Sequence, residues 1–135
     1  MLVNQRITAI RRYRRLEGRE LAHMAGLSAA EISHVERKMR TPRIDTLQKI
    51  SAALDVTTGF LLGEEDGDIP LPRALKIQSL KVFLRHNKVP PVVDAYLHRI
   101  SARDSAPDSV KGWRDLVTNV SQLPGQETLS DPKLI

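Results

Sequence analysis

The sequence has no cysteine among its 135 residues, which excludes disulfide bonds and metal sites built from thiolates. It also has no apolar run near the ~20 residues of a membrane-spanning helix, and its first ten residues lack the apolar core of a signal peptide. Aromatic residues make up only 4%, against 41% hydrophobic residues. An aliphatic core with so few rings favours packed helices over a sheet sandwich. We therefore expect an all-α cytoplasmic protein with no membrane partner.

Positive charge is concentrated in the first half of the chain. Residues 1–62 contain 11 Lys and Arg against 6 Asp and Glu, whereas residues 63–135 contain 10 of each kind. The whole net charge of +5 therefore lies before residue 63. A basic module joined to a neutral one predicts that the first half meets a polyanion. A solvated basic face without a ligand is the alternative that charge alone leaves open.

The chain divides at an acidic stretch rich in proline and glycine, "EEDGDIPLP". Such a stretch neither buries a core face nor continues a helix, so residues 64–72 are predicted to be a linker. Residues 1–63 and 73–122 then form two helical domains, and residues 123–135 a flexible tail. The predicted helices are Asn4 to about Arg15, Gly18–Ala25, Ala29–Arg37, Ile44–Leu54, Thr58–Leu62, Arg73–His86, Pro91–Ser101 and Asp108–Gln122.

Two of the predicted helices, "GRELAHMA" and "AAEISHVER", have the pattern of a helix-turn-helix. That motif needs a small residue where the helices touch, a glycine in the turn, a cap, and apolar residues that fix the second helix. An unrelated bundle of two amphipathic helices is the alternative, but a match at fixed spacing favours the motif. The matching residues are Leu21, Ala22, Gly26, Leu27, Ser28, Ile32 and Val35.

Residues 7–62 resemble the XRE family of transcriptional regulators, the Cro and phage-repressor type. The resemblance rests on "ELAHMAGLS", "ISHVER", "RTPRIDTLQKISAALDV" and "FLLG". It implies a five-helix, lambda-repressor-like domain that binds double-stranded DNA. In two places the sequence departs from the family: Glu17 and Gly18 stand where a polar cap and a phosphate-binding Gln are usual, and Lys38 replaces the glycine after the second helix.

The resemblance also implies roles for particular residues. Arg11 and Glu36 would form a structural ion pair rather than contact DNA. The outward-facing positions of the recognition helix agree with the family's base-facing positions, because Ile32 and Val35 face the core. The base-facing residues are then Ser28, Ala29, Ala30, Ser33 and His34, and the phosphate contacts are Arg37, Lys38, Arg40, Thr41 and Arg43.

Residues 71–120 resemble the small C-terminal domain of DdrO-type radiation-response repressors, through "LPRAL", "PVVDAYLHRI", Pro107 and Trp113. This implies a dimerisation domain that an ImmA/IrrE-type zinc peptidase cuts before its last helix. The corresponding bond joins Ala102 to Arg103 in the stretch "SARDSAP", for which an ordinary helix connection is the alternative. The apolar stripes expected to dimerise contain Val93, Tyr96, Leu97, Ile100, Trp113 and Val117.

The sequence therefore predicts a dimeric repressor, associated with the nucleoid, that binds an inverted-repeat operator, with a role in a stress response. The alternative is a protein-interaction module of antitoxin type that uses the same fold without DNA. Catalysis is not expected, because the four histidines (His23, His34, His86 and His98) are scattered and no phosphate loop or nucleophile elbow occurs. No cofactor or metal is expected.

Overall fold

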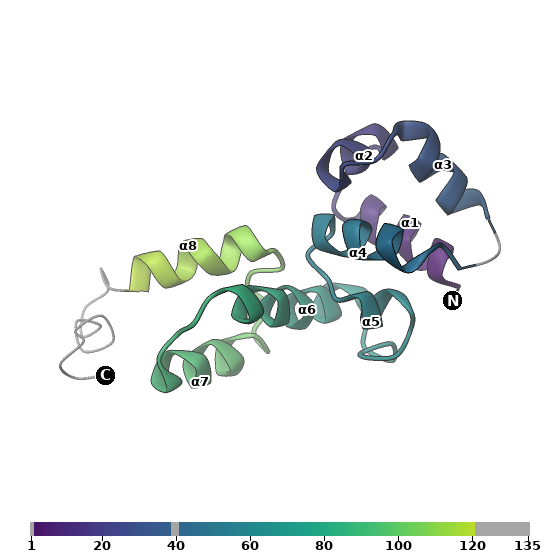
Figure 1. Ribbon diagram of the computed structural model, residues 1–135. Helices are drawn as coiled ribbons and strands as arrows, with labels where there is room; N and C mark the ends of the chain where they lie inside the picture. Colours follow the sequence, from purple (N-terminus) through teal and green to yellow (C-terminus); the bar gives the residue numbers. More distant parts are fainter. Residues whose placement is uncertain (1, 39–40, 121–135) are drawn as a thin grey trace. The chain divides into compact units, whose positions relative to one another are not determined.

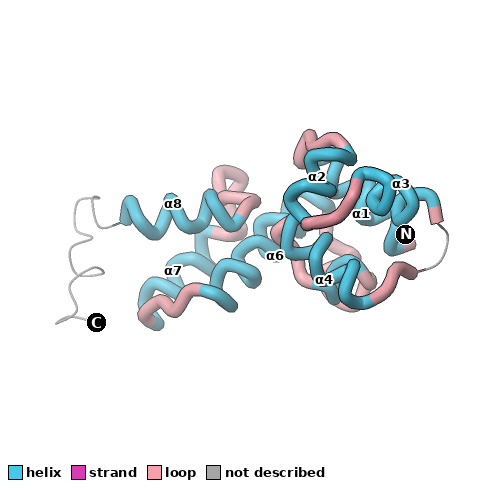
Figure 2. The backbone as a smooth tube through the Cα atoms, turned by 45° about the horizontal axis from the view of Figure 1, so that its top comes forward, coloured by secondary structure: helices cyan, strands magenta, loops and turns pink. Residues whose placement is uncertain are grey.

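The computed structural model describes residues 2–38 and 41–120, and every regular element in these ranges is a helix. The expectation of an all-α protein is therefore confirmed. The chain splits into two compact units, Met1–Leu71 and Pro72–Ile135. Figures 1 and 2 show their helices and the loops that join them.

The first unit contains five helices, two of which begin at a residue whose side chain caps the helix. Side-chain oxygens of Ser28 and Thr57 accept hydrogen bonds from the backbone N–H groups of Glu31 and Phe60, which pairs donors that a helix start leaves free. The bounds agree with the predicted ones to within two residues. The helices are α1 (Val3–Tyr13), α2 (Gly18–Ala25), α3 (Ala29–Arg37), α4 (Ile44–Ala53) and α5 (Thr58–Leu61).

The core of the first unit is aliphatic apart from one ring, as the composition indicates. Helix α1 packs against α3 and α5, α2 against α3 and α4, and α4 against α5. Helices α1, α3 and α4 contribute hydrophobic side chains at intervals of three residues, which places them on one face of each helix. The buried hydrophobic residues are Ile7, Ile10, Leu21, Ala22, Ala25, Ile32, Val35, Leu47, Ile50, Leu54, Val56, Phe60 and Leu61.

The acidic stretch after α5 is tied back to the first unit. The Thr57 hydroxyl donates to Oε1 of Glu65 at 2.6 Å, and the backbone N–H of Glu64 donates to the carbonyl of Gly59 at 2.8 Å. These bonds hold at least the start of the predicted linker, residues 64–72, against α5. The linker also ends earlier than predicted, because α6 already begins at Leu71. Pro72 fits a first helical turn, where its missing N–H is not needed.

The second unit contains α6 (Leu71–His86), α7 (Pro91–Ile100) and α8 (Val110–Val120). Its core is one cluster of buried side chains from all three helices. The indole Nε1 of Trp113 donates to the hydroxyl of Ser79 at 2.9 Å, so the polar edge of the ring is paired inside this core. The cluster consists of Leu80, Phe83, Val93, Leu97, Ile100 and Trp113.

Two predictions for the second unit are corrected by this packing. Val93, Leu97, Ile100 and Trp113 were expected to dimerise, but they are buried in the unit's own core; only Tyr96 and Val117 of that set stay partly exposed. Helix α8 begins at Val110 rather than at Asp108, and the Ser109 hydroxyl just before it accepts the N–H of Gly112 at 3.0 Å. The predicted end of this helix at Gln122 and the tail, residues 123–135, lie outside the described residues.

Candidate nucleic-acid interface

The turn between α2 and α3 depends on one glycine. Gly26 has φ +70° and ψ +30°, a left-handed backbone conformation that residues with a side chain rarely adopt. The backbone N–H of Leu27 reaches back to the carbonyl of Ala22 at 2.9 Å, which closes the end of α2. A Cβ at Gly26 would meet no atom within 4 Å. Backbone conformation, not space, therefore favours glycine here. The turn sets the angle at which α3 leaves α2.

Helix α3 begins with a reciprocal capping box. The Ser28 hydroxyl accepts the N–H of Glu31 at 3.1 Å, and the Glu31 carboxylate accepts the N–H of Ser28 at 3.0 Å. The bonds from the backbone and the hydroxyl of Ser28 lower the pKa of Glu31, and the positive charge of Lys49 adds to this effect. The start of α3 is therefore fixed locally, and it carries an ionised carboxylate at neutral pH.

The two faces of α3 differ in burial. Ile32 and Val35 keep only 1% and 7% of their surface exposed, which fixes the inner face. Of the five predicted base-facing residues, Ser33 is half-buried and the other four are exposed: Ser28, Ala29, Ala30 and His34. The tip of the outer face thus carries two methyl groups, followed by an imidazole one turn later.

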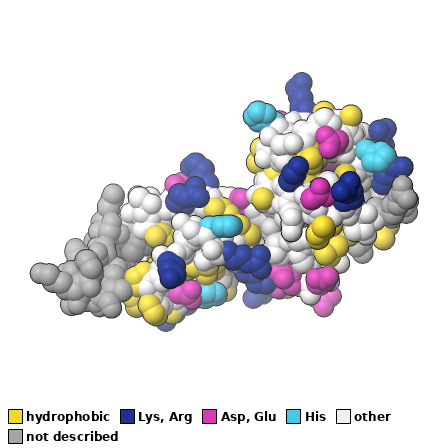
Figure 3. Space-filling model, viewed as in Figure 1, with side chains coloured by type: hydrophobic (Ala, Val, Ile, Leu, Met, Phe, Trp, Pro, Cys, Tyr) yellow, Lys and Arg dark blue, Asp and Glu magenta, His cyan; other side chains and the backbone are white. Residues whose placement is uncertain are grey.

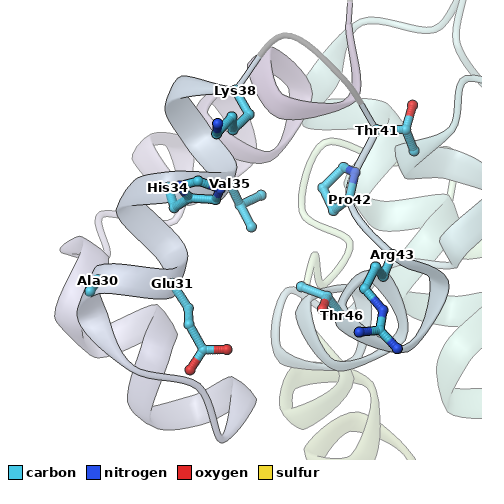
Figure 4. Close-up of a pocket in the computed structure, with 9 residues that line it drawn as sticks. All are labelled: Ala30, Glu31, His34, Val35, Lys38, Thr41, Pro42, Arg43 and Thr46. Carbon is cyan, nitrogen blue, oxygen red and sulfur yellow. The ribbon is translucent and has the colours of Figure 1, made fainter.

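An open groove lies between α3 and the chain that leads into α4 (Figure 4). Its volume is about 770 Å³. One wall of the groove comes from α3 and the residue after it, and the other comes from the segment leading into α4. The first wall contains Ala30, Glu31, His34, Val35 and Lys38, and the second contains Thr41, Pro42, Arg43 and Thr46. The groove brings together five predicted DNA-contact residues from both sides, while Arg40 lies outside the described residues.

Two polar residues of the groove were not predicted as site residues. Glu31 and Thr46 line it, from α3 and from the first turn of α4. The S-x-x-E spacing of Ser28 and Glu31 could have indicated that the carboxylate lies at the start of the recognition helix. For Thr46 no local signal exists, because its place in the groove depends on how α4 packs.

An ion pair joins α1 to the last turn of α3. Nε of Arg11 lies 2.6 Å from Oε1 of Glu36, and Nη2 lies 3.1 Å from Oε2. Nη1 donates to the carbonyl of Leu16 at 2.8 Å, so each guanidinium nitrogen has a partner. The hydrogen bonds and charge of Glu36 raise the pKa of Arg11 despite its partial burial. The pair therefore fixes α3 and offers no free cation.

Two other arginines of the first unit also donate hydrogen bonds to backbone carbonyls. Nη1 of Arg6 donates to the carbonyl of Phe60 at 3.0 Å, and Nε of Arg14 donates to that of Leu54 at 2.9 Å. Arg37 and Arg43 are exposed beside the groove, with Arg43 weakly paired to Asp45 at 3.6 Å. In the view of Figure 3, Lys and Arg are spread over the first unit, whereas acidic side chains gather over the turn after α5.

At both departures from the family pattern the backbone keeps regular geometry, although Gly18 supplies no side chain in place of the usual Gln. The backbone N–H of Glu17, before α2, donates to the Glu20 carboxylate at 2.9 Å, which supplies a cap contact. Lys38, after α3, has φ −78° and ψ 144°, an extended conformation open to any residue. No glycine is therefore needed where the family usually has one.

Residues 10–61 match the family model described as Helix-turn-helix. Within these residues, which are less than half of the chain, α2, the turn at Gly26 and α3 have the arrangement of the two helices and the turn of that motif. The match spans α2, the turn at Gly26 and α3, together with α4, α5 and the last turns of α1. In that motif α3 is the second helix, and the groove of Figure 4 borders its exposed face.

Named relatives of the helix-turn-helix domain are regulators and repressors. The chain is 38% identical over 65 residues to the immunity repressor protein of Bacillus phage phi105, which is 48% of this chain and 45% of that protein. It is 39% identical over 66 residues to the HTH-type transcriptional regulator SinR of Bacillus licheniformis, 48% of this chain and 60% of that one. Identity to SinR of Bacillus subtilis is 38% over 65 residues, with 47% and 59% covered.

The chain thus spans between 45% and 60% of the length of these relatives. A solved SinR protein/SinI protein complex matches with 25% identity and a TM-score of 0.46, covering 85% of this chain and 99% of that one. Each curated relative is named for regulation or repression and none for catalysis. The family match itself lies within the first unit, at residues 10–61.

Other kinds of site receive no support from the described part of the chain. Within residues 2–38 and 41–120, no three His, Asp or Glu side chains are placed to hold a metal ion. Over the same ranges, no helix is long and apolar enough to cross a membrane.

Proposed function

We propose that this chain is a sequence-specific DNA-binding transcriptional repressor that places α3 in the major groove. The exposed face of α3 supports the proposal: it begins with a capping box, presents the short side chains of Ala29 and Ala30, and is followed by cations. A helix of this kind fits the major groove, and its flanking cations reach the phosphates. The names of the curated relatives support the same function.

The side chains suggest how such a helix would recognise DNA. Ala29 and Ala30 allow a close approach, and their methyl groups can pack on the C5-methyl of thymine. His34 can donate or accept a hydrogen bond at a base edge. Arg37, Lys38 and Arg43 would bind phosphates and supply affinity that falls as salt rises. Recognition would then depend on fit at the tip of α3 and on few hydrogen bonds.

Glu31 adds a constraint to this scheme. Its carboxylate is ionised at neutral pH and lines the groove, so it disfavours a phosphate on that side. A carboxylate can instead accept a hydrogen bond from the amino group of cytosine. We expect phosphate contacts to concentrate on the segment from Lys38 to Arg43, away from the first turn of α3.

The proposed repressor acts as a dimer on an inverted repeat whose half-sites lie about one helical turn apart. Partly exposed hydrophobic residues of the second unit support this: Tyr96, Leu116 and Val117 pack at the edge of its core. Three short helices also make a small core, and a partner would increase the buried area. The protein would work in the cytoplasm, at the nucleoid when bound.

The experiment that tests the function selects duplexes from a random pool with the full chain. The expected result is an enriched inverted repeat, and an affinity for it that falls steeply with salt concentration. The same salt series on a random duplex separates a DNA binder from a protein-interaction module of antitoxin type. Failure to enrich any sequence, together with no binding at low salt, would exclude the repressor.

We further propose that proteolysis before α8 ends repression, through an ImmA/IrrE-type zinc peptidase responding to stress. The side chains of Ala102 and Arg103 are exposed, as a cleavage site requires. Loss of α8 would remove Trp113 from the core and so dissolve the dimer. Deletion of residues 103–135 followed by size and operator-binding measurements tests this step: a truncated chain that stays dimeric and binds as tightly contradicts it.

A further inference from the structure

The end of α1 carries four arginines within five residues, "RRYRR", and they divide into two pairs. Arg11 and Arg14 are bonded to groups of the first unit, a carboxylate and a backbone carbonyl. Arg12 and Arg15 are exposed, and neither side chain makes a hydrogen bond or an ion pair with any residue that the structure describes. The folded first unit therefore leaves two cations unused at this helix end.

Arg15 has a backbone conformation that suits glycine. Its φ is +57°, in the left-handed region. Its N–H bonds to the carbonyl of Arg12 at 3.0 Å, and the N–H of Leu16 bonds to that of Arg11 at 3.0 Å. This pair of bonds ends a helix with a left-handed residue, where glycine is usual because a Cβ is crowded there. After α2 the left-handed residue is indeed a glycine, Gly26. An arginine at position 15 thus costs folding free energy that a glycine would not.

The neighbouring charge adds a second cost. Arg12 and Arg15 lie one helical turn apart, so their positive charges repel each other. The acidic residue nearest in sequence, Glu17, does not compensate them, because its carboxylate accepts a hydrogen bond from Nε of Arg19 at 2.8 Å. A bound anion would offset this repulsion, and a guanidinium binds a phosphate well through paired hydrogen bonds. Both costs are explained if this helix end binds phosphate.

The connection of this helix end to α3 indicates which phosphate it is. The carbonyl of Leu16, the residue after Arg15, accepts a hydrogen bond from Nη1 of Arg11 at 2.8 Å. The same guanidinium holds Glu36 in the last turn of α3. When the second helix of this motif lies in the major groove, the first helix crosses the sugar–phosphate backbone. Helix α2 is that first helix, and it begins at Gly18, only three residues after Arg15. The DNA backbone is therefore the anion expected here.

We infer that Arg15, with Arg12 beside it, binds a phosphate of the DNA backbone at the turn between α1 and α2, which rests on the proposed function. The contact comes from α1 and is separate from those expected after α3. It adds affinity and fixes orientation without reading bases. A strained backbone is retained where function depends on the side chain. Replacing Arg15 by glycine should therefore make the protein more stable and at the same time a weaker DNA binder.

The test compares Arg15→Gly, Arg15→Asn and Arg15→Lys in the full chain. Asn also tolerates the left-handed conformation, and Lys keeps the charge. Arg15→Gly should raise the urea midpoint, lower affinity for the selected operator about fivefold, and lower the salt slope by about 0.9, the equivalent of one phosphate contact. Arg15→Asn should show the same losses of affinity and slope, whereas Arg15→Lys should stay within about twofold of wild type.

The matched control for charge is Arg99→Gln, which removes an exposed arginine from α7 of the second unit and should leave the slope unchanged. Wild-type affinity and slope in both Arg15→Gly and Arg15→Asn would overturn the inference. A loss of affinity that follows a lowered urea midpoint, with an unchanged slope, would overturn it too, because reduced stability then explains the loss.

Single methylphosphonate substitutions locate the contact, because each removes the charge of one phosphate. One substitution should weaken binding of the wild type and have no effect on Arg15→Gly. If every substitution weakens both proteins equally, Arg15 touches no phosphate. A wild-type chain that binds no duplex even at low salt overturns the proposed function as well, whereas a wild type that binds while the Arg15 variants match it overturns this inference alone.

Discussion

Arg11 and Glu36 join α1 to the last turn of α3 by two parallel hydrogen bonds, 2.6 Å from Nε to Oε1 and 3.1 Å from Nη2 to Oε2. Each side chain keeps 15% of its surface exposed, so the pair is largely removed from water. Paired geometry of this kind compensates the desolvation of both charges, whereas removal of one partner leaves the other charge buried alone. The pair therefore makes the position of α3 depend on α1.

A double-mutant cycle with Arg11→Met and Glu36→Leu measures this dependence. Each single change should lower the free energy of unfolding by about 2–3 kcal/mol, and the coupling energy should be about 1–3 kcal/mol. Urea denaturation gives all four values. The matched control is the exposed pair of Arg19 and Glu17, with side chains 79% and 64% exposed. Its coupling should stay below about 0.5 kcal/mol, and equal coupling in the two cycles would contradict the argument.

The capping box predicts how stability depends on pH at the start of α3. The folded pKa of Glu31 lies below its ordinary value, so its ionisation adds stability that is full above about pH 4.3 and is lost as pH falls through the lowered pKa. Ser28→Ala should cost about 1 kcal/mol at neutral pH and move the Glu31 pKa back up toward its ordinary value. Ser28→Thr should preserve both properties. A carboxyl titration followed by NMR, with an unmoved midpoint in Ser28→Ala, would show that the cap does not act on Glu31.

Base reading and phosphate binding should separate in two groove variants. Ala30→Gln places a long amide at the tip of α3 and should change the preferred base there, with little change in salt slope. Arg43→Gln should weaken binding to all duplexes alike and lower the salt slope by about 0.9. Selected sequences and salt titrations measure the two effects. If Ala30→Gln leaves base preference unaltered, Ala30 does not face bases.

How much of this could be read from the sequence depends on how local each feature is. The bounds of α3 were predicted because its signals lie within the segment itself: the glycine turn, the Ser28 cap, and the Ile32 and Val35 spacing. The hydrogen bond that the side-chain amide of Asn4 donates to the backbone carbonyl of Lys38 gives no such signal, because an Asn in a helix does not indicate a carbonyl 34 residues away. It could be found only after α1 and α3 were packed.

The dimerisation residues show a second limit. An apolar stripe on a helix shows that its face is covered, not whether the same chain or a partner covers it. Other side chains of the same unit bury Val93, Leu97, Ile100 and Trp113 in its core. The sequence therefore predicted which faces of α7 and α8 are buried, but it did not show that the same chain buries these four residues.

That correction gives a prediction about oligomeric state. Tyr96→Glu changes a partly exposed residue and should leave helicity intact while it shifts the protein toward monomer in sedimentation experiments. Trp113→Ala removes a fully buried ring and its bond to Ser79, and should destabilise the second unit by about 3–5 kcal/mol. Circular dichroism distinguishes the two results. A dimer that survives Tyr96→Glu would place its interface elsewhere.

Lys76 of α6 binds the backbone of the loop before α8. Its Nζ donates to the carbonyl of Arg103 at 3.0 Å and to that of Asp104 at 2.6 Å. Turn bonds from Arg103 N–H to Ile100 O at 2.9 Å and from Ala106 N–H to Arg103 O at 3.1 Å keep the loop folded. A peptidase needs an extended strand, so these bonds must open before cleavage near Ala102, although the side chains are exposed.

Lys76→Met keeps the apolar stem and removes the donors, so the loop should open more often. An arginine-specific protease should then cut after Arg103 about fivefold faster, which corresponds to about 1 kcal/mol of lost hydrogen bonding. Lys88→Met, an exposed lysine outside these contacts, is the control and should match wild type. Equal rates for Lys76→Met and Lys88→Met, at equal global stability, would mean that the turns alone protect the loop. A faster cut confined to Lys76→Met would make opening of this loop the step that any cleavage-based regulation must overcome.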